Sequence, residues 1–268
     1  MTQQEFAAAG LALSREAGVV DNFHAYFVQH CPRLYKLCRV FHLLENNLGD
    51  VLEIGPFFGY TPFLLQPNAT SFAVLEGDDA SAYPLKALYQ KRGIAVQYVD
   101  LFEIFGPIHS ATHRLVHADA SFNTILCWGT MEHFNFNPVK FVRELHRVLK
   151  PGGRVYISVP NRASFQNIVE LLFGRSDREV VDRYYTFEDF QCNGKTAFYG
   201  FHWREYSCPE MAQLFARAGF TVLGAGTSVA FQVHARTSIL RRIARGGNRV
   251  LAGLLPRYGT DSNLVAEK

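Results

Sequence analysis

The sequence has few cysteines: there are five among 268 residues, with no CxxC pair and no spacing typical of a structural zinc site. An odd number of cysteines at wide spacing argues against a secreted disulfide framework. An excess of charge of one sign is also missing, because 27 lysine and arginine residues against 24 aspartate and glutamate residues give a net charge of only +3. So mild a balance does not indicate nucleic-acid binding, and none is expected.

Long apolar runs are missing too, and the N-terminus lacks the basic and apolar regions of a secretory signal. We therefore expect a cytoplasmic protein without a transmembrane segment. His109, His113 and His117 recur at intervals of four, which suits a metal only on a helix. Because His117 and Asp119 directly precede a predicted strand, we predict no metal site.

Short apolar runs alternate with amphipathic segments along most of the chain, in which hydrophobic residues make up 48%. Strands are predicted at 51–54, 71–77, 94–100, 121–129, 154–161, 221–226 and 261–268. Helices are predicted at 21–47, 61–65, 82–93, 138–153 and 209–220. Thr61 is predicted as the N-cap of its helix, with Pro62 in the first turn. The alternation predicts an α/β fold, doubly wound around a mostly parallel seven-stranded sheet with helices on both faces.

A glycine turn, EIGPFFG (53–59), follows the first predicted strand. Glycine allows the backbone to approach a ligand closely and opens a helix whose N–H groups face that ligand. Glu76 ends the second strand, where a carboxylate can accept hydrogen bonds from ribose hydroxyls. Asp100 ends the third strand and could accept a hydrogen bond from an adenine amino group. These acids, with Glu53, predict a nucleoside site at the carboxyl edge of the sheet.

The predicted nucleoside site has no basic clamp for a pyrophosphate. This favours an adenosyl group with a cationic sulfonium over a dinucleotide. The dinucleotide pattern GxGxxG also fails, because Phe57 and Tyr60 stand where glycines are required. A nicotinamide-dependent dehydrogenase is therefore disfavoured.

On these residues the sequence resembles the class I S-adenosylmethionine-dependent methyltransferases of the Rossmann-like type. The matching stretches are VLEIGPFFG (51–59), VLEG (74–77), YVD (98–100), SFNTILCWGTMEHF (121–134), FVRELHRVLKPGGRVYISVPN (141–161) and REYSCPEMAQLFARAGF (204–220). Their order and spacing agree over roughly residues 33–226. The LKPGG-strand-PN element together with EH after the fourth strand is the specific part of the resemblance.

The resemblance implies S-adenosyl-L-methionine as the cofactor, and it assigns contacts residue by residue. Those contacts are Arg33 for the cofactor carboxylate, Glu53, Gly55, Pro56, Phe57 and Gly59 in the loop around the methionine moiety, Glu76 for the ribose, Asp100 and Leu101 beside the adenine, and Cys127 and Trp128 on the pocket floor. Phe57 departs from the family pattern, which usually has glycine there. A phenylalanine does not adopt positive φ cheaply, so the backbone there is ordinary with the ring pointing away, or cofactor affinity is reduced.

The resemblance also implies one methyltransferase domain over residues 1–268. We expect a helical cap at 1–48, a cofactor-binding core at 49–161, a substrate-covering insertion at 162–206, and the rest of the sheet with a basic helix at 207–268. The basic stretch 236–257 suits peripheral contact with an anionic membrane or substrate, or a helix with its apolar face on the core. The oligomeric state is not indicated.

Methyl transfer requires alignment of a nucleophile, and a hydroxyl nucleophile benefits from a base whose pKa lies near neutrality. His133 is the first candidate, with a structural histidine as the alternative. His202 and Tyr206, with Glu205 beside them, are further candidates on the inserted segment, and Tyr184 and Tyr185 could line an acceptor pocket.

The sequence therefore predicts a methyltransferase that acts on a small molecule or glycan and is directed to oxygen. The alternatives are an N- or C-methyltransferase, or a non-catalytic S-adenosylmethionine-binding or scaffold protein.

Overall fold

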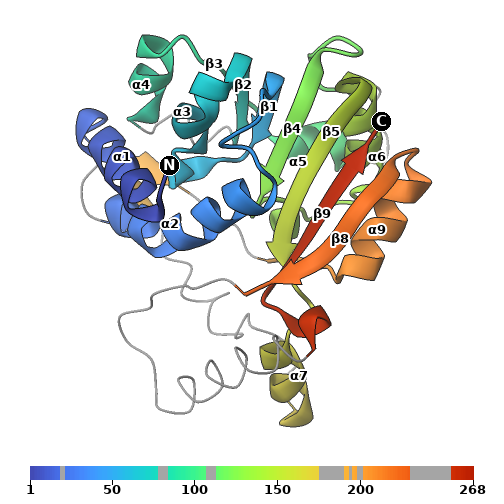
Figure 1. The fold of residues 1–268 in the computed structure, drawn as a ribbon. Helices are drawn as coiled ribbons and strands as arrows, with labels where there is room; N and C mark the ends of the chain where they lie inside the picture. The colour runs from blue at the N-terminus through green and yellow to red at the C-terminus, as the bar shows by residue number, and fades with distance from the viewer. Residues whose placement is uncertain are drawn as a thin grey trace.

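A seven-stranded sheet forms the centre of the molecule in the computed structural model (Figure 1). The structure describes residues 1–18, 22–77, 84–106, 113–174, 190–192, 195–197, 202–229 and 255–268. The strand order is β3-β2-β1-β4-β5-β9-β8. The strands are β1 (Gly49–Ile54), β2 (Ala69–Glu76), β3 (Ala95–Tyr98), β4 (Phe122–Trp128), β5 (Leu149–Pro160), β8 (Thr221–Ser228) and β9 (Asp261–Glu267), and a separate pair is β6 (Phe190–Cys192) with β7 (Lys195–Ala197).

Strands β1 to β5 pair in parallel, whereas β9 runs antiparallel to both β5 and β8. The strand order reverses between β1 and β4, where Ile54 lies opposite Cys127. In such sheets ligands bind at the carboxyl ends of the strands beside this reversal. The predicted doubly wound, mostly parallel fold is confirmed, and the predicted last strand is β9, inserted between two earlier ones.

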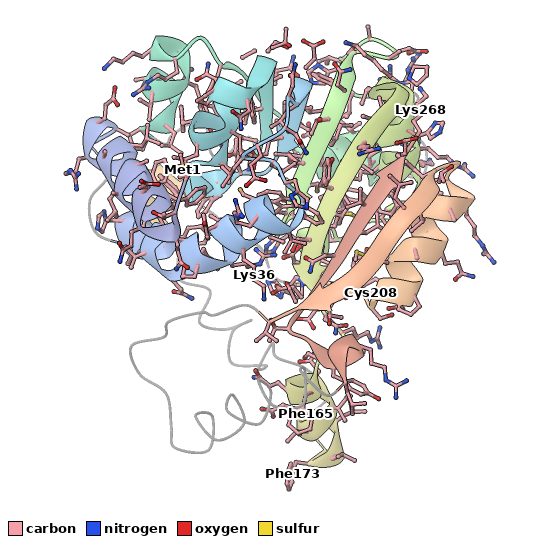
Figure 2. The ribbon with its side chains drawn as sticks, viewed as in Figure 1. Met1, Lys36, Phe165, Phe173, Cys208 and Lys268 are labelled. Carbon is pink, nitrogen blue, oxygen red and sulfur yellow. The ribbon has the colours of Figure 1, made fainter. Side chains whose placement is uncertain are left out.

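Helices cover both faces of the sheet. One face packs against α1 (Gln3–Glu16), α2 (Asn22–Val40), α3 (Thr61–Leu65) and α4 (Leu85–Lys91), and the other against α5 (Leu101–Phe105), α6 (Val139–Val148) and α9 (Cys208–Arg217). Helix α7 (Phe165–Leu172) follows β5, and Figure 2 shows its first residue, Phe165, and the following Phe173 at the end of the molecule opposite Lys268. The carboxyl edge of the parallel strands therefore faces α7.

Two predicted helices end earlier than expected. The first ends at Val40 instead of residue 47, because His42 adopts φ 55° and the N–H of Leu43 turns back to the Cys38 carbonyl. The second ends at Val148, and the LKPGG stretch begins β5 instead. Proline lacks an N–H and biases the preceding residue toward extended backbone, so a helix cannot run through that stretch. The prediction also missed α5 and α7.

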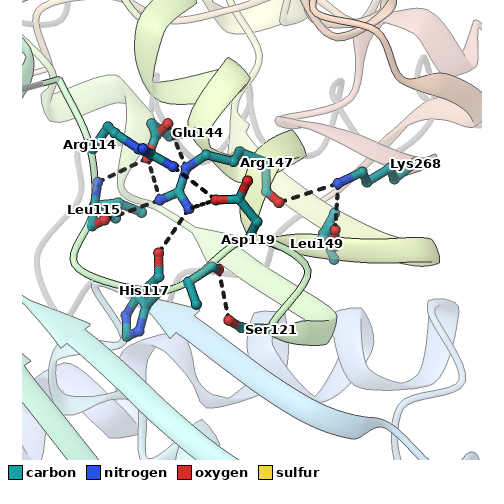
Figure 3. A network of polar contacts seen from close by, with 10 residues as sticks. Arg114, Leu115, His117, Asp119, Ser121, Glu144, Arg147, Leu149 and Lys268 are labelled. Carbon is teal, nitrogen blue, oxygen red and sulfur yellow. Dashed lines mark hydrogen bonds and ion pairs between the residues drawn. The ribbon is translucent and has the colours of Figure 1, made fainter.

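A polar network around Arg147 lies at the amino edge of the sheet, before β4 begins (Figure 3). The guanidinium donates to both carboxylate oxygens of Glu144, to Oδ1 of Asp119 and to the carbonyls of Leu115 and His117. Glu144 also accepts the N–H of Leu115 at 3.0 Å. The guanidinium thus has acceptors on all three of its nitrogens, and the network joins α6 to the loop before β4.

Some sequence-based predictions fall outside the described residues. These are His109, Tyr184, Tyr185 and most of the basic stretch 236–257. Among the residues that are described, no helix is both long enough and apolar enough to cross a lipid bilayer. The division of the chain into cap, core and insertion stays a prediction.

Candidate functional site

The turn after β1 brings the backbone against the end of β4. Gly55 adopts φ 63°, and a Cβ added there would stand 2.7 Å from Oγ1 of Thr130. That hydroxyl in turn donates to the carbonyl of Ile54 at 3.1 Å. A side chain at position 55 would therefore clash and be strained, so the glycine is required for this close approach.

Glu76 points back at the glycine turn from the end of β2. Its Oε1 accepts the backbone N–H of Phe57 at 2.8 Å, and the side chain is buried. Phe57 itself adopts φ 49°, so of the two alternatives for this position the one with ordinary backbone is wrong, and reduced cofactor affinity stays a prediction. The hydrogen bond to Glu76 and edge contacts of the ring with Tyr26 and Phe58 hold a conformation that costs about 1–2 kcal/mol for a non-glycine residue.

Glu53 is buried beneath the turn and bonds to α3. Thr61 donates its hydroxyl to Oε1 of Glu53, whereas Tyr60 takes the N-cap position, so the prediction of Thr61 as the cap is wrong. The Thr61 hydroxyl bonds to Glu53 of β1 and not to a backbone N–H of its own helix. Burial, and secondarily the charge of Glu76, raises the pKa of Glu53 to about 8. Glu53 is therefore mostly neutral at pH 7.

The rest of the turn packs against α2. Pro56 is buried, and its carbonyl accepts the N–H of Gly59 at 2.9 Å. A Cβ on Gly59 would lie 3.3 Å from Cδ1 of Leu34, so its small size lets α2 approach the turn. At the next strand, Oδ1 of Asp100 accepts the N–H of Phe102 and caps α5. Asp100 is exposed and Leu101 half-buried, just beyond the end of β3.

Cys127 and Trp128 end β4 and are both buried. Burial, and then the nearby charge of Glu132, raises the pKa of the Cys127 thiol far above its usual range, so the thiol is neutral and not a nucleophile. Nε1 of Trp128 has no hydrogen-bond partner within the described part of the chain. An unsatisfied buried indole N–H calls for a ligand or water acceptor.

Arg33 reaches across from α2 to the far side of β4. Its Nε donates to Oδ1 of Asp261 at 3.1 Å, and its Nη2 donates to Oγ of Ser158 at 3.0 Å. Its Nη1 lies beside Gly129, 3.4 Å from where a Cβ of that glycine would be. The guanidinium is thus at the sheet edge and partly committed to β5 and β9. Asp261 and Ser158 were not predicted, because only the tertiary fold brings them to Arg33.

The predicted catalytic residues gather near Gly129 as well, because a Cβ added to that glycine would lie 3.6 Å from Oε1 of Glu132. Glu132 and His133 lie on the short helix η4 (Met131–His133), and each of Glu132, His133 and His202 offers one donor atom within 4.8 Å of the others. The Glu132 carbonyl accepts the N–H of Trp203 at 2.8 Å, which holds the two segments together. Tyr206 is buried, and burial raises its pKa. The phenol therefore stays protonated near pH 7. Glu132 was not predicted as a site residue, although it is part of the EH motif after the fourth strand.

These residues fit an adenosyl cofactor with a sulfonium. A buried carboxylate faces the glycine turn, the indole of Trp128 is unsatisfied, and the described residues at this edge offer no lysine or arginine cluster for a pyrophosphate. An open α/β sheet with such a turn at its strand reversal defines a nucleoside-binding protein of the Rossmann-like class.

Comparison with known proteins agrees with that class. The profile of a family described as "Methyltransferase domain" matches residues 28–225. A "Probable S-adenosylmethionine-dependent methyltransferase" of Mycolicibacterium smegmatis is 28% identical over 173 residues, which are 65% of this chain and 52% of that protein. The chain spans about half the length of the curated relatives it matches.

Solved structures share the fold at low identity. An S-adenosylmethionine-dependent methyltransferase of Mesorhizobium loti has a TM-score of 0.52 and 14% identity, over 90% of this chain and 98% of the other. A Thermotoga maritima structure described as "SAM-dependent methyltransferase, possible histamine N-methyltransferase" has a TM-score of 0.53 and 15% identity, over 91% and 92%.

The chain belongs to the methyltransferase domain family. The prediction of a class I S-adenosylmethionine-dependent methyltransferase is confirmed, and with it S-adenosyl-L-methionine as the family's cofactor. The roles of individual residues stay predictions.

Proposed function

We propose that this chain transfers the methyl group of S-adenosylmethionine to a hydroxyl of a small molecule or glycan. The observation that carries the proposal is the pairing of two sites at one sheet edge. Glu76 faces the glycine turn on one side of the strand reversal. The cluster of Glu132, His133 and His202 lies just past β4 on the other.

The residues of the first site would hold the cofactor. A carboxylate can accept several hydrogen bonds at once, so Glu76 can keep the Phe57 N–H while it accepts a ribose hydroxyl. Asp100 and Leu101 would border the adenine. Of the remaining predicted contacts, Trp128 offers an unsatisfied N–H.

The residues of the second site would activate the acceptor. When bound, the cofactor supplies a methyl group on a sulfonium, an electrophile that needs no further activation. The protein then has to align the acceptor hydroxyl and exclude water. On transfer, the oxygen–carbon bond would form while the carbon–sulfur electron pair passed to sulfur, and the acceptor hydroxyl would have to lose its proton. His133 and His202 can assist that loss, and Tyr206 can orient the oxygen as a donor.

Specific observations favour two alternatives to an O-methyltransferase. An N- or C-methyltransferase would use the same cofactor site, and one fold neighbour is described as a possible histamine N-methyltransferase. The strained backbone of Phe57 in the cofactor turn is the basis for the other alternative, a non-catalytic S-adenosylmethionine-binding or scaffold protein.

Methyl transfer from labelled cofactor tests the proposal. The purified protein is incubated with labelled S-adenosylmethionine and a cell extract, and the labelled product is identified. A labelled ether or ester is expected, whereas a labelled amine would support the N-methyltransferase. Binding of cofactor with no labelled product from any extract would support the scaffold.

Glu76→Ala should weaken binding of the demethylated cofactor by about 1–3 kcal/mol, because a charged acceptor is lost. Isothermal titration measures it, with Asp50→Asn as the control. Asp50 is a strand carboxylate that pairs with Lys150 away from the turn. Unchanged affinity in Glu76→Ala would contradict the ribose assignment.

His133→Ala should lower turnover about 100-fold or more, with little change in cofactor affinity. His42→Ala is the matched control, because that imidazole is exposed and outside the site. Equal turnover in His133→Ala and the control would make His133 a structural residue.

A further inference from the structure

Among the described residues, one group could hold a metal ion, and it consists of Glu132, His133 and His202. Two of them are neighbours on η4, and the third is fixed beside them by the hydrogen bond from Trp203 N–H to the Glu132 carbonyl. Donor atoms that share one zinc ion stand about 3.4 Å apart when each bond is about 2.1 Å long. The donor atoms of the three residues lie within 4.8 Å of one another, and small rotations of the two half-buried imidazoles would bring them to that spacing.

The Glu132 carboxylate supplies a second, independent sign of a ligand. The residue is only 3% exposed, and its Oε2 has no hydrogen-bond partner among the described residues. A buried carboxylate oxygen without a partner is unfavourable unless something binds it. A cation between this oxygen and the two imidazoles would remove that cost.

Neighbouring polar groups orient the cluster as metal sites usually require. Nδ1 of His202 lies 3.4 Å from Oε1 of Glu205, and the other oxygen of Glu205 accepts from Nδ2 of Asn167 at 2.7 Å. A carboxylate behind a ligand imidazole fixes its tautomer and leaves the other ring nitrogen for the metal. The rings of His133 and His202 are steeply inclined, at 71° with centroids 5.0 Å apart, so their edges can meet at one point.

We propose that Glu132, His133 and His202 bind a divalent transition-metal ion of the Zn²⁺ or Mn²⁺ type. Two imidazoles and one carboxylate suit such ions better than Mg²⁺, which prefers oxygen ligands. Three protein ligands leave a coordination position open. The inference rests on the proposed function and deepens it: the acceptor is a hydroxyl that fills the open position, where the ion lowers its pKa and its proton passes to solvent.

Metal titration of the full chain tests this inference. Protein stripped with a chelator is titrated with Zn²⁺ and, separately, with Mn²⁺ by calorimetry. Wild type should bind one equivalent and gain thermal stability. Glu132→Gln and His202→Ala should lose at least tenfold in affinity together with that gain, whereas His42→Ala should behave as wild type. Circular dichroism verifies that each variant is folded, and Glu132→Gln keeps the shape of the side chain it replaces.

No saturable binding by wild type, or equal affinity in wild type, Glu132→Gln and His202→Ala, would overturn the metal site. Binding of demethylated cofactor to the same metal-free protein separates this failure from that of the proposed function. If that cofactor binds and neither metal does, only the metal site is wrong. If the metal binds at this cluster and the cofactor does not, the proposed function fails and the site stands.

Discussion

The two edges of the central sheet treat buried polar groups in opposite ways. At the amino edge, Arg147 finds acceptors for all of its nitrogens, and Glu144 is held by both Arg147 and a backbone N–H (Figure 3). At the carboxyl edge, Oε2 of Glu53, Oε2 of Glu132 and the indole N–H of Trp128 have no partner among the described residues. Nε2 of His117 is the amino-edge exception.

A satisfied network needs nothing further, whereas unsatisfied buried groups persist where a ligand completes them. The contrast therefore separates residues that maintain the fold from residues that serve binding. It also predicts that substitutions at the two edges have different readouts: mainly stability at the amino edge, and mainly binding or pH response at the carboxyl edge.

The largest expected effect on stability is at the amino edge. Arg147→Met should lower the free energy of unfolding by about 3 kcal/mol, because it leaves Glu144 buried without its charged partner. Cofactor affinity should not change. Urea unfolding and calorimetric titration measure the two quantities.

Arg154→Met is the matched control for this change. Arg154 pairs with Glu267 at 2.9 Å on an exposed surface, so its loss should cost less than about 1 kcal/mol. Equal costs for Arg147→Met and Arg154→Met would show that the amino-edge network does not hold the fold.

Two glycines with similar backbone conformation, one at each edge of the sheet, test whether close packing at the carboxyl edge matters. Gly55 at the carboxyl edge and Gly152 at the amino edge adopt φ 63° and 73°, but only Gly55 has neighbours within 4 Å of an added Cβ. Gly152→Ala should cost about 1 kcal/mol from strain alone, and Gly55→Ala roughly 1–3 kcal/mol more from overpacking against Thr130. Only Gly55→Ala should also weaken cofactor binding. Equal losses of stability in the two variants would show that the close approach of Gly55 to Thr130 does not constrain the turn.

The smallest effect at any single step of one pH unit is a pH dependence of stability. Glu53 has a folded-state pKa of about 8 against 4.5 in the unfolded chain, so the native state keeps a proton that the unfolded state releases between these values. Stability should therefore fall as pH rises through that window, by up to about 1.4 kcal/mol per unit. Glu53→Gln should lack this slope.

Urea unfolding at pH 5.5, 6.5 and 7.5 measures the difference between wild type and Glu53→Gln. At the amino edge, the hydrogen bond from Arg147 lowers the pKa of Asp119, so its contribution has the opposite sign and is lost only on strong acidification. Parallel stability profiles for wild type and Glu53→Gln between these pH values would refute the neutral form of Glu53.

The sequence predicted the cofactor side of the fold well because its signals are local. The glycine turn and the acid at the end of β2 lie within one βαβ unit, where each strand ends at a recognisable residue. Boundaries failed where tertiary contacts decided them. Thr61 bonds to buried Glu53 and caps nothing. LKPGG joins a strand because Leu149 pairs with Phe122 of β4, and because Gly152 and Gly153 exchange backbone hydrogen bonds with Lys268, just past β9.

The partners of Arg33 and His202 could not be predicted in the same way. Arg33, Ser158 and Asp261 come from three distant segments, and only the insertion of β9 into the sheet places the last of them beside the first. The grouping of His202 with Glu132 likewise depends on a backbone hydrogen bond that no spacing in the sequence encodes.

The position of β9 has a consequence for synthesis. This strand comes after every other strand in the chain, yet it fills the gap between β5 and β8. During translation, β1 to β5 can assemble early, but β5 keeps an open edge and β8 has no neighbour until residues 261–267 leave the ribosome. The buried ion pair between Arg33 and Asp261 can form only after that, so the parallel part of the sheet can assemble well before β9 joins β5 to β8.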